Sequence, residues 1–162
     1  MSWVDSTLTA LDRMGYAGAL LAGFLGTSIP FFPSFILIPL MATQLNPLIV
    51  GVISGIGAGL GQYLHYYVGL GGRHLFSPEN RARFERWRDR YGKHGAWLIL
   101  LLAATPLTPD DIVWIPLGLM RYPKKKALAA GIVGKTILSL VYAFAGYYGW
   151  PMIDELLNNW GL

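Results

Sequence analysis

The feature that most constrains this chain is a long segment without formal charge. No Asp, Glu, Lys or Arg occurs between Arg13 and Arg73. A water-soluble domain of 162 residues could not cover so long an uncharged stretch, whereas about 20 apolar residues are enough to cross about 30 Å of hydrocarbon. Apolar residues make up 54% of the chain and charged residues only 14%. We therefore expect one membrane domain over residues 1–162, integral to the cell membrane.

The composition excludes several classes of site. The chain has no cysteine, which excludes disulfide scaffolds, thiolate metal sites and thiol nucleophiles. It carries no nucleophile elbow, P-loop, dinucleotide fingerprint or paired-histidine motif, so we expect neither an enzyme nor a bound cofactor or metal. The net charge of +4 comes from clusters beside the apolar segments. This placement indicates membrane lipids with anionic head groups as partners, and not nucleic acid.

Four apolar segments follow one another along the chain. The second and fourth, residues 47–69 and 127–149, have the length of ordinary transmembrane helices. The first and third, residues 15–45 and 95–120, are each interrupted by two prolines three positions apart. These prolines are Pro30 and Pro33 in the first segment and Pro106 and Pro109 in the third. Because proline breaks helical hydrogen bonding and leaves halves too short to span, we predict two re-entrant helical hairpins.

The two halves of the chain repeat. At a constant offset of 76 residues the two proline pairs coincide, and Pro47 falls on Pro123. Each half, residues 15–70 and 95–149, then holds one hairpin and one span, and an odd number of crossings requires the second copy to be inverted. The expected fold class is an all-α integral membrane protein built as an inverted repeat, an arrangement typical of secondary transporters.

The basic residues favour one topology. They gather in a linker at residues 73–94 and in a short loop that begins with Arg121. Two hairpins would place both clusters on one side, the cytoplasmic side by the positive-inside rule, with both termini outside. Within the linker, Ser77 and Pro78 predict the start of an amphipathic helix at the membrane surface. A solvated basic linker is the alternative.

Two acids follow the second proline pair. Asp110 and Asp111 would lie deep in the bilayer, where an ionisable side chain costs about 2.5 to 3.5 kcal/mol on insertion scales and commonly serves a proton or substrate pathway. The alternative is structural, with Thr108 as helix N-cap, Pro109 as first helical residue and an acid satisfying free backbone amides. We hypothesise that at least one of the two acids contacts substrate or exchanges a proton.

Four further positions are candidates for an anionic group. The half-helix that begins at Pro33 carries Ser34 and no acid, so its free amides and its dipole favour an anion. Lys135 lies about 12 Å inside the fourth segment, where it could pair with an Asp, hold a lipid phosphate or snorkel to the surface. Thr108 and Arg121 complete the candidate head-group site.

Two patterns in the second segment have a structural interpretation. His65 stands among tyrosines, which is typical of an aromatic belt at the membrane interface, and a proton relay is the alternative. Glycines at every fourth position predict close contact between helices. They are Gly51, Gly55 and Gly59.

Four short motifs stand in the order and spacing of a known family. They are SIPFFPS at residues 28–34, GIGAGLGQY at 55–63, TPLTP at 105–109 and PLGLM at 116–120. In these motifs the chain resembles the DedA superfamily, also called the SNARE-associated or VTT domain. The resemblance implies two opposed re-entrant hairpins, an amphipathic linker, and movement of phosphorylated lipids such as polyprenyl phosphate or phospholipids by a flippase or scramblase. In bacterial relatives this movement is linked to the proton-motive force.

The chain departs from the family pattern in its charges. Relatives carry an acid in the first hairpin and arginines near the second break, whereas this chain has Ser28 and Ser34 in the first hairpin and the two acids after the second break. We expect a proton-coupled transporter of phosphorylated lipids, working as a homodimer because two spans leave little room for a pathway. The alternatives are a non-transporting membrane scaffold and an exporter of small molecules.

Overall fold

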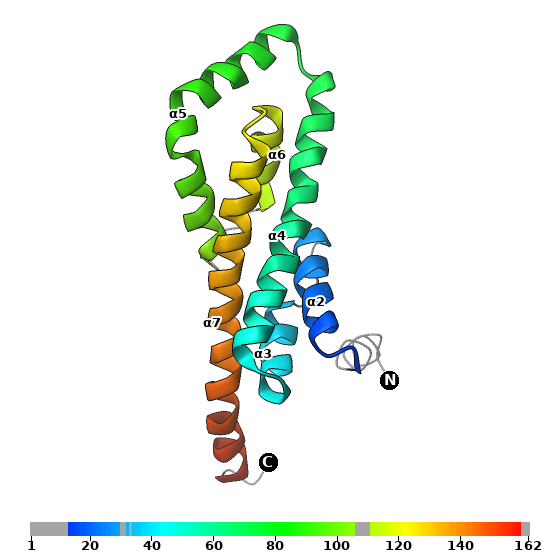
Figure 1. Ribbon diagram of the computed structural model, residues 1–162, viewed down its shortest axis with the longest axis vertical. Helices are drawn as coiled ribbons and strands as arrows, with labels where there is room; N and C mark the ends of the chain where they lie inside the picture. The colour runs from blue at the N-terminus through cyan, green and yellow to red at the C-terminus, as the bar shows by residue number, and fades with distance from the viewer. Residues whose placement is uncertain (1–12, 30–31, 33, 106–110, 160–162) are drawn as a thin grey trace.

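The molecule is built around two long helices. The computed structural model describes residues 13–29, 32, 34–105 and 111–159, and every regular element in these ranges is a helix, which confirms the all-α part of the predicted fold class. Two of the described helices are long and apolar enough to cross a membrane. They are α4 (Pro47–Gly72), continued by the short 3-10 helix η1 (Arg73–Leu75), and α7 (Lys124–Asn159). Figure 1 shows them running in opposite directions, side by side.

Two pairs of shorter helices take the place of the interrupted segments. The first pair is α2 (Tyr16–Ser28) and α3 (Ser34–Gln44). The second pair is α5 (Pro78–Ala104) and α6 (Asp111–Leu119). Helices α2 and α5 each end two residues before a proline pair, where proline disfavours helical geometry in the residue that precedes it. In Figure 1, α3 runs opposite to α2, and α6 runs opposite to the last part of α5.

A tyrosine hydrogen bond closes each helix pair at its outer end. In the first pair, the Asn46 N–H donates to Tyr16 Oη (3.4 Å). In the second pair, the Tyr122 hydroxyl donates to the Gly92 carbonyl (3.3 Å). Burial raises the pKa of the Tyr122 phenol, so the group stays a neutral donor at physiological pH. Both partners of the second bond stand 76 residues after those of the first, so the two pairs are closed at equivalent positions.

The helices pack in a regular scheme. Helix α2 packs on α4 and α5 packs on α7, so each pair rests its first helix on the long helix of its own half. Helix α3 packs on α7 and α6 packs on α4, so each pair rests its second helix on the long helix of the other half. The contact between α4 and α7 holds the two halves together.

Glycines on α4 make this packing close. A Cβ added to Gly55 would collide with the backbone of Thr136 in α7. The same seam continues with Gly51 against Leu140 and Gly59 against Ile132. This confirms the predicted packing role of the three glycines.

Two separate cores stabilise the two halves. The first joins α2, α3, α4 and α7 through small and aliphatic side chains: Ala19, Ala22, Leu37, Ile38, Met41, Ala42, Val50 and Ala143. The second joins α4, α5, α6 and α7 around aromatic side chains: Tyr66, Ile99, Trp114, Leu117, Tyr122, Ala127 and Ala130. Each core lies between one helix pair and the α4–α7 seam.

Helix α5 differs from the predicted linker. Its N-cap is Ser77, whose hydroxyl accepts from the Asn80 N–H (3.4 Å), and Pro78 is its first residue, as predicted. The helix does not end at the expected boundary near residue 95 and continues to Ala104 as one element that changes direction in Figure 1. The change from charged to apolar sequence is therefore not a helix boundary, because no proline interrupts it. Helix α7 likewise extends past the expected end of the fourth segment, through Pro151.

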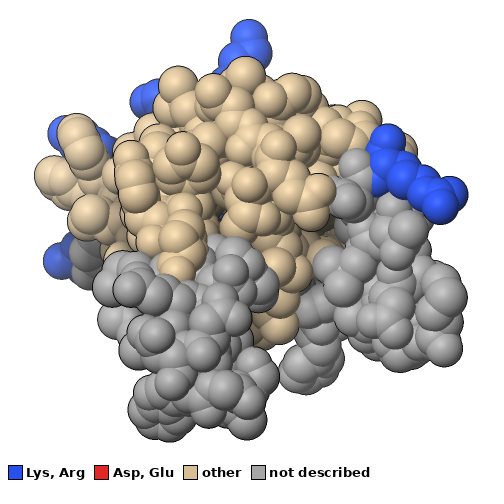
Figure 2. Space-filling view, turned by 90° about the horizontal axis from the view of Figure 1, so that it is seen from below, with Lys and Arg blue, Asp and Glu red and all other residues tan. Residues whose placement is uncertain are grey.

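Charge and apolar surface are distributed as in a protein surrounded by lipid. Except for Arg13 and Lys135, every basic residue lies in η1, in α5 or at residues 121–126, near the upper end of Figure 1. Viewed from the opposite end, the described residues show Lys and Arg only at the edges (Figure 2). Large apolar side chains are exposed along the outer faces of the helices, including Trp97 and Leu101 of α5 and Val141 of α7. Exposed apolar surface of this extent is typical of contact with a membrane.

Candidate functional site

The helix ends that precede the two interruptions lie beside the middle of the long helices. The Thr27 hydroxyl, next to the end of α2, donates to the Ala58 carbonyl in the middle of α4 (2.8 Å). Gly134, in the middle of the apolar part of α7, lies against Leu100 and Ala103 near the end of α5. The inner ends of the two helix pairs, which we call the first and second tip, therefore approach the same depth of the molecule from opposite ends (Figure 1).

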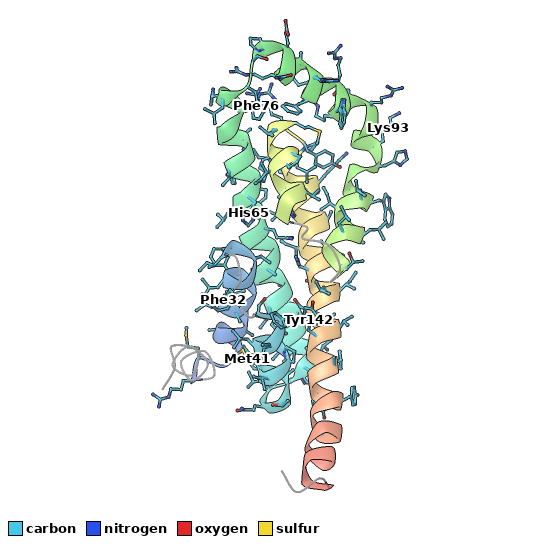
Figure 3. All side chains as sticks on the ribbon, turned by 180° about the vertical axis from the view of Figure 1, so that it is seen from behind. Phe32, Met41, His65, Phe76, Lys93 and Tyr142 are labelled. Atoms are coloured by element: carbon cyan, nitrogen blue, oxygen red, sulfur yellow. The ribbon has the colours of Figure 1, made fainter. Side chains whose placement is uncertain are left out.

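The first tip holds two buried polar atoms without a hydrogen-bond partner among the described residues. They are Ser28 Oγ and His65 Nδ1. Ser28 lies beside Gly61 of α4, and His65 follows one helical turn later on the same face. Figure 3 shows His65 on α4 close to the end of α2. Buried polar atoms of this kind are normally satisfied by ordered water or by a ligand.

The second tip holds a buried cation. Lys135 is only 8% exposed, so its side chain lies inside the protein and does not reach the surface. One turn earlier on the same face of α7, Gly131 lies against the Trp114 ring of α6, with Gln62 of α4 close by. Lys135 therefore lies on the face of α7 that looks toward α4 and α6.

Asp111 begins α6 at the same tip. It is the first residue of that helix and precedes Trp114 by about one turn, as Lys135 follows Gly131 by one turn. Because α6 and α7 run in opposite directions (Figure 1), this register places the first turn of α6 at about the depth of the Lys135 turn of α7. The remaining predicted positions at the two breaks lie outside the described residues: Pro30, Pro33, Pro106, Thr108, Pro109 and Asp110.

Ser34 lies in the first helix pair. It is the first residue of α3, and its side chain lies directly against Gly26 of α2. The serine thus packs the two helices of the pair against each other, close to the first tip.

Arg121 lies at the end of the molecule, away from both tips. It ends α6 with a positive φ of 52°. The Tyr122 N–H donates to the Leu117 carbonyl (3.0 Å) and the Arg121 N–H to the Gly118 carbonyl (3.1 Å), which is a Schellman motif. The structure therefore gives Arg121 a helix-capping role and does not bring it together with Ser34 or Lys135.

The interior between the tips combines groups that suit an anionic ligand. Besides the cation, α4 and α7 bury neutral polar residues near their middle: Ser54, Gln62 and Ser139. Chemically, the amine could attract a negative charge, while the hydroxyl and imidazole groups could exchange hydrogen bonds or protons with a ligand or water. Sequence reasoning assigned His65 to an interfacial belt because of its three tyrosine neighbours, with a proton relay as the alternative, and did not place it in this interior. Its offset of four residues from Gly61 was the available signal.

A comparison with known protein families gives a match. The sequence profile of the VTT domain matches residues 30–148. The matched region begins two residues after the end of α2 and ends in α7, so it contains the second tip and the α3 side of the first. No curated protein and no solved structure gives a significant match to the chain.

Proposed function

This chain belongs to the VTT domain family, a membrane-associated and transporter-like family, and on that premise we propose that it moves phosphorylated lipids across the bilayer. The substrates would be polyprenyl phosphate or phospholipids, and the chain would act as a carrier and not as an enzyme. The lipid head group would pass through the polar interior between the two tips, while its apolar chains stay in the surrounding membrane.

In this proposal the two helix pairs are re-entrant hairpins that enter the membrane from opposite sides. Three observations support it. The chain reverses direction within each pair, a tyrosine hydrogen bond joins the two helices of each pair at the outer end, and α3 and α6 each pack on the long helix of the other half. Each of the three occurs in both halves of the chain, and the hydrogen-bonded residues of the second half stand 76 positions after those of the first. The basic end would face the cytoplasm by the positive-inside rule.

The observation that carries the proposal is the burial of Lys135. An ionisable side chain in the centre of a membrane helix costs about 2.5 to 3.5 kcal/mol and is usually retained for function. We propose that Lys135 receives the phosphate of the head group. In the absence of lipid, we propose that Asp111, in the first turn of α6, balances its charge.

The acids of the second tip would couple transport to protons. When the phosphate binds Lys135, Asp111 or Asp110 loses its favourable partner, and burial of an unpaired carboxyl favours the protonated form. Release of the phosphate would reverse the change. The competing interpretation is that the acids only cap α6, in which case their charge has no effect on coupling.

The direct test is transport in liposomes that contain the purified protein. Labelled polyprenyl phosphate or phospholipid would be followed with and without an imposed pH gradient. We expect Lys135→Met to lower the rate at least about tenfold, since hydrogen bonds to a charged group contribute roughly 1.5 to 3 kcal/mol. Lys125→Met is the matched control, because Lys125 is an exposed lysine near the start of the same helix.

The acids are tested in the same assay. Asp110→Asn and Asp111→Asn, singly or together, should leave lipid movement insensitive to the pH gradient, whereas Asp89→Asn on the exposed face of α5 should not. Coupling that survives in the double variant would favour capping. A folded protein that moves no lipid under any gradient would favour the scaffold. Movement of small soluble compounds that lipid does not inhibit would favour the exporter.

A further inference from the structure

We propose that a groove between α5 and α6 binds one anionic phospholipid from the bilayer, with an acyl chain in the groove and the head group on an arginine cluster of α5. This site is separate from the interior between the tips. It would hold a resident lipid at the basic end of the molecule, independent of the proposed transport.

The groove has an apolar wall on both sides. It encloses about 310 Å³, within the range of ordinary ligand pockets. Its floor and walls are formed mainly by Leu98 and Ile99 of α5 and by Val113, Leu117 and Met120 of α6. A surface of this composition has no hydrogen bonds to offer and suits a hydrocarbon chain.

A cationic hollow lies next to the groove on the same helix. It encloses about 470 Å³ and is lined by Arg83, Arg86 and Arg90 together with Trp87. Because these arginines are spaced by three and four residues, they lie on one face of α5. The structure shows no ion pair for any of the three within the described residues, while the neighbouring acids are engaged by other arginines, Glu85 by Arg73 and Asp89 by Arg88.

Trp87 joins the two cavities. It lines both the cationic hollow and the apolar groove, and Arg88 and His94 stand at the groove on the same helix. Tryptophan with neighbouring arginines is typical of the membrane interface, where one end of a side chain is wet and the other is apolar. The order of the surface, cationic first and apolar beyond Trp87, matches the order of groups in an anionic phospholipid.

Charge complementarity decides in favour of an anionic lipid as the occupant. Each cation near an anionic membrane surface contributes about 1 kcal/mol of attraction. A soluble phosphate would use the arginines and leave the groove unfilled, whereas a neutral lipid would fill the groove and leave three cations without a counter-charge. Only a lipid with an anionic head group satisfies both parts.

The test measures contact between the groove and lipid chains directly. Because the chain has no cysteine, Leu98→Cys gives a single attachment point for a bimane fluorophore at the groove, at a side chain that is 55% exposed. The labelled protein would be placed in phosphatidylcholine nanodiscs that contain either brominated phosphatidylglycerol or brominated phosphatidylcholine at equal mole fraction. We expect roughly tenfold tighter apparent binding of the anionic lipid, as judged by bromine quenching.

Three variants make the result specific. Replacing Arg83, Arg86 and Arg90 together with Gln should abolish the preference for the anionic lipid. Replacing Lys124, Lys125 and Lys126 with Gln removes the same charge from exposed positions outside the groove and should keep it. Gly92→Leu should fill the groove and reduce quenching by both lipids, since an added Cβ there meets no atom closer than 3.9 Å and the helix should remain intact.

Equal quenching by the two lipids, or a preference that survives loss of the three arginines, would overturn the proposal. Lys135→Met should leave the quenching unchanged. Quenching tests the lipid site and the liposome assay tests transport, so either proposal can fail without the other.

Discussion

The two helix pairs occupy equivalent places in the molecule and differ in chemistry. The described residues of the first tip include Ser28 and His65 and no Asp, Glu, Lys or Arg, whereas the second tip has Lys135 and the start of α6 at Asp111. Their outer ends are closed by equivalent tyrosine bonds. The comparison shows that the scaffold depends on how closely helices approach, and that ionisable groups can be placed at one tip without changing that scaffold.

The two pairs also differ in how their helices pack. In the first pair small residues bring backbones into direct contact, with Gly57 against the Leu20 carbonyl and Gly23 against the Ser54 carbonyl. In the second pair the Trp114 ring extends from α6 to Gly131 of α7 and fills the space between these helices. The second pair has close backbone contacts as well, with Gly69 of α4 against the Ile115 carbonyl and Gly118 of α6 against the Tyr66 carbonyl, and the Trp114 ring adds a large side chain to them.

The largest expected effect comes from breaking the seam that both halves share. In Gly55→Leu the new side chain would collide with the Thr136 backbone, which cannot rotate away. Overpacking costs about 1 to 3 kcal/mol even where side chains can move, so we expect loss of folded, monodisperse protein on size-exclusion chromatography in detergent. Gly71→Leu is the control, since an added Cβ there meets nothing within 4 Å. Equal yields of the two variants would contradict the seam.

The second prediction compares the two cores. Trp114→Ala should lower the free energy of unfolding by about 3 to 5 kcal/mol, because a 1% exposed ring that bridges two helices leaves a large cavity. Leu37→Ala in the first core should lower it by about 2 kcal/mol, since neighbours such as Ala19 already pack tightly and leave a smaller void. Denaturant titration in mixed micelles measures both. The account would be wrong if the leucine were the more costly loss.

The third prediction concerns a clamp at the basic end of the molecule. Arg73 is buried and donates to the Leu119 carbonyl (2.8 Å) and to the Glu85 carboxylate (2.5 Å), so it ties the end of α4 to α6 and α5. Arg73→Ala should lower stability by about 1.5 to 3 kcal/mol. Arg88→Ala, which removes an exposed pair with the adjacent Asp89, should change it by less than about 1 kcal/mol. Thermal unfolding that cannot distinguish the two variants would argue against the clamp.

The smallest expected effect compares glycine substitutions at the residues that follow α3 and α6. Arg121 adopts a left-handed conformation that costs an L-residue roughly 1 kcal/mol, so Arg121→Gly should raise the melting temperature slightly. The equivalent position in the first half is Leu45, whose side chain packs against the first core, and Leu45→Gly should lower it. A lower melting temperature for Arg121→Gly would mean that its side chain does more than cap the helix.

The sequence predicts much of this scaffold because its strongest signals are local. Proline pairs fix where α2 and α5 end, Ser77 and Pro78 fix where α5 begins, and glycines at every fourth position of α4 identify the seam. The continuity of α5 could not be predicted from the change in charge near residue 95. Charged and apolar residues can both belong to one helix, so a change in polarity does not mark where a helix ends.

The candidate site is less visible in the sequence. Lys135 stands out because it is a charge in an apolar segment, and its burial agrees with a role inside the protein. His65 and Ser28 do not stand out, because neutral polar residues are common near membrane interfaces. Their importance depends on the long-range contact between α2 and α4, which no local pattern contains.

The central claim is that each interrupted segment returns to the face of the membrane from which it entered. Single-cysteine variants at Arg13, Gln44, Lys93 and Lys124, all exposed, would be reacted with a membrane-impermeant maleimide in sealed vesicles of known orientation. The account predicts that positions 13 and 44 react from one face and positions 93 and 124 from the other. Reaction of positions 13 and 44 from opposite faces would contradict it.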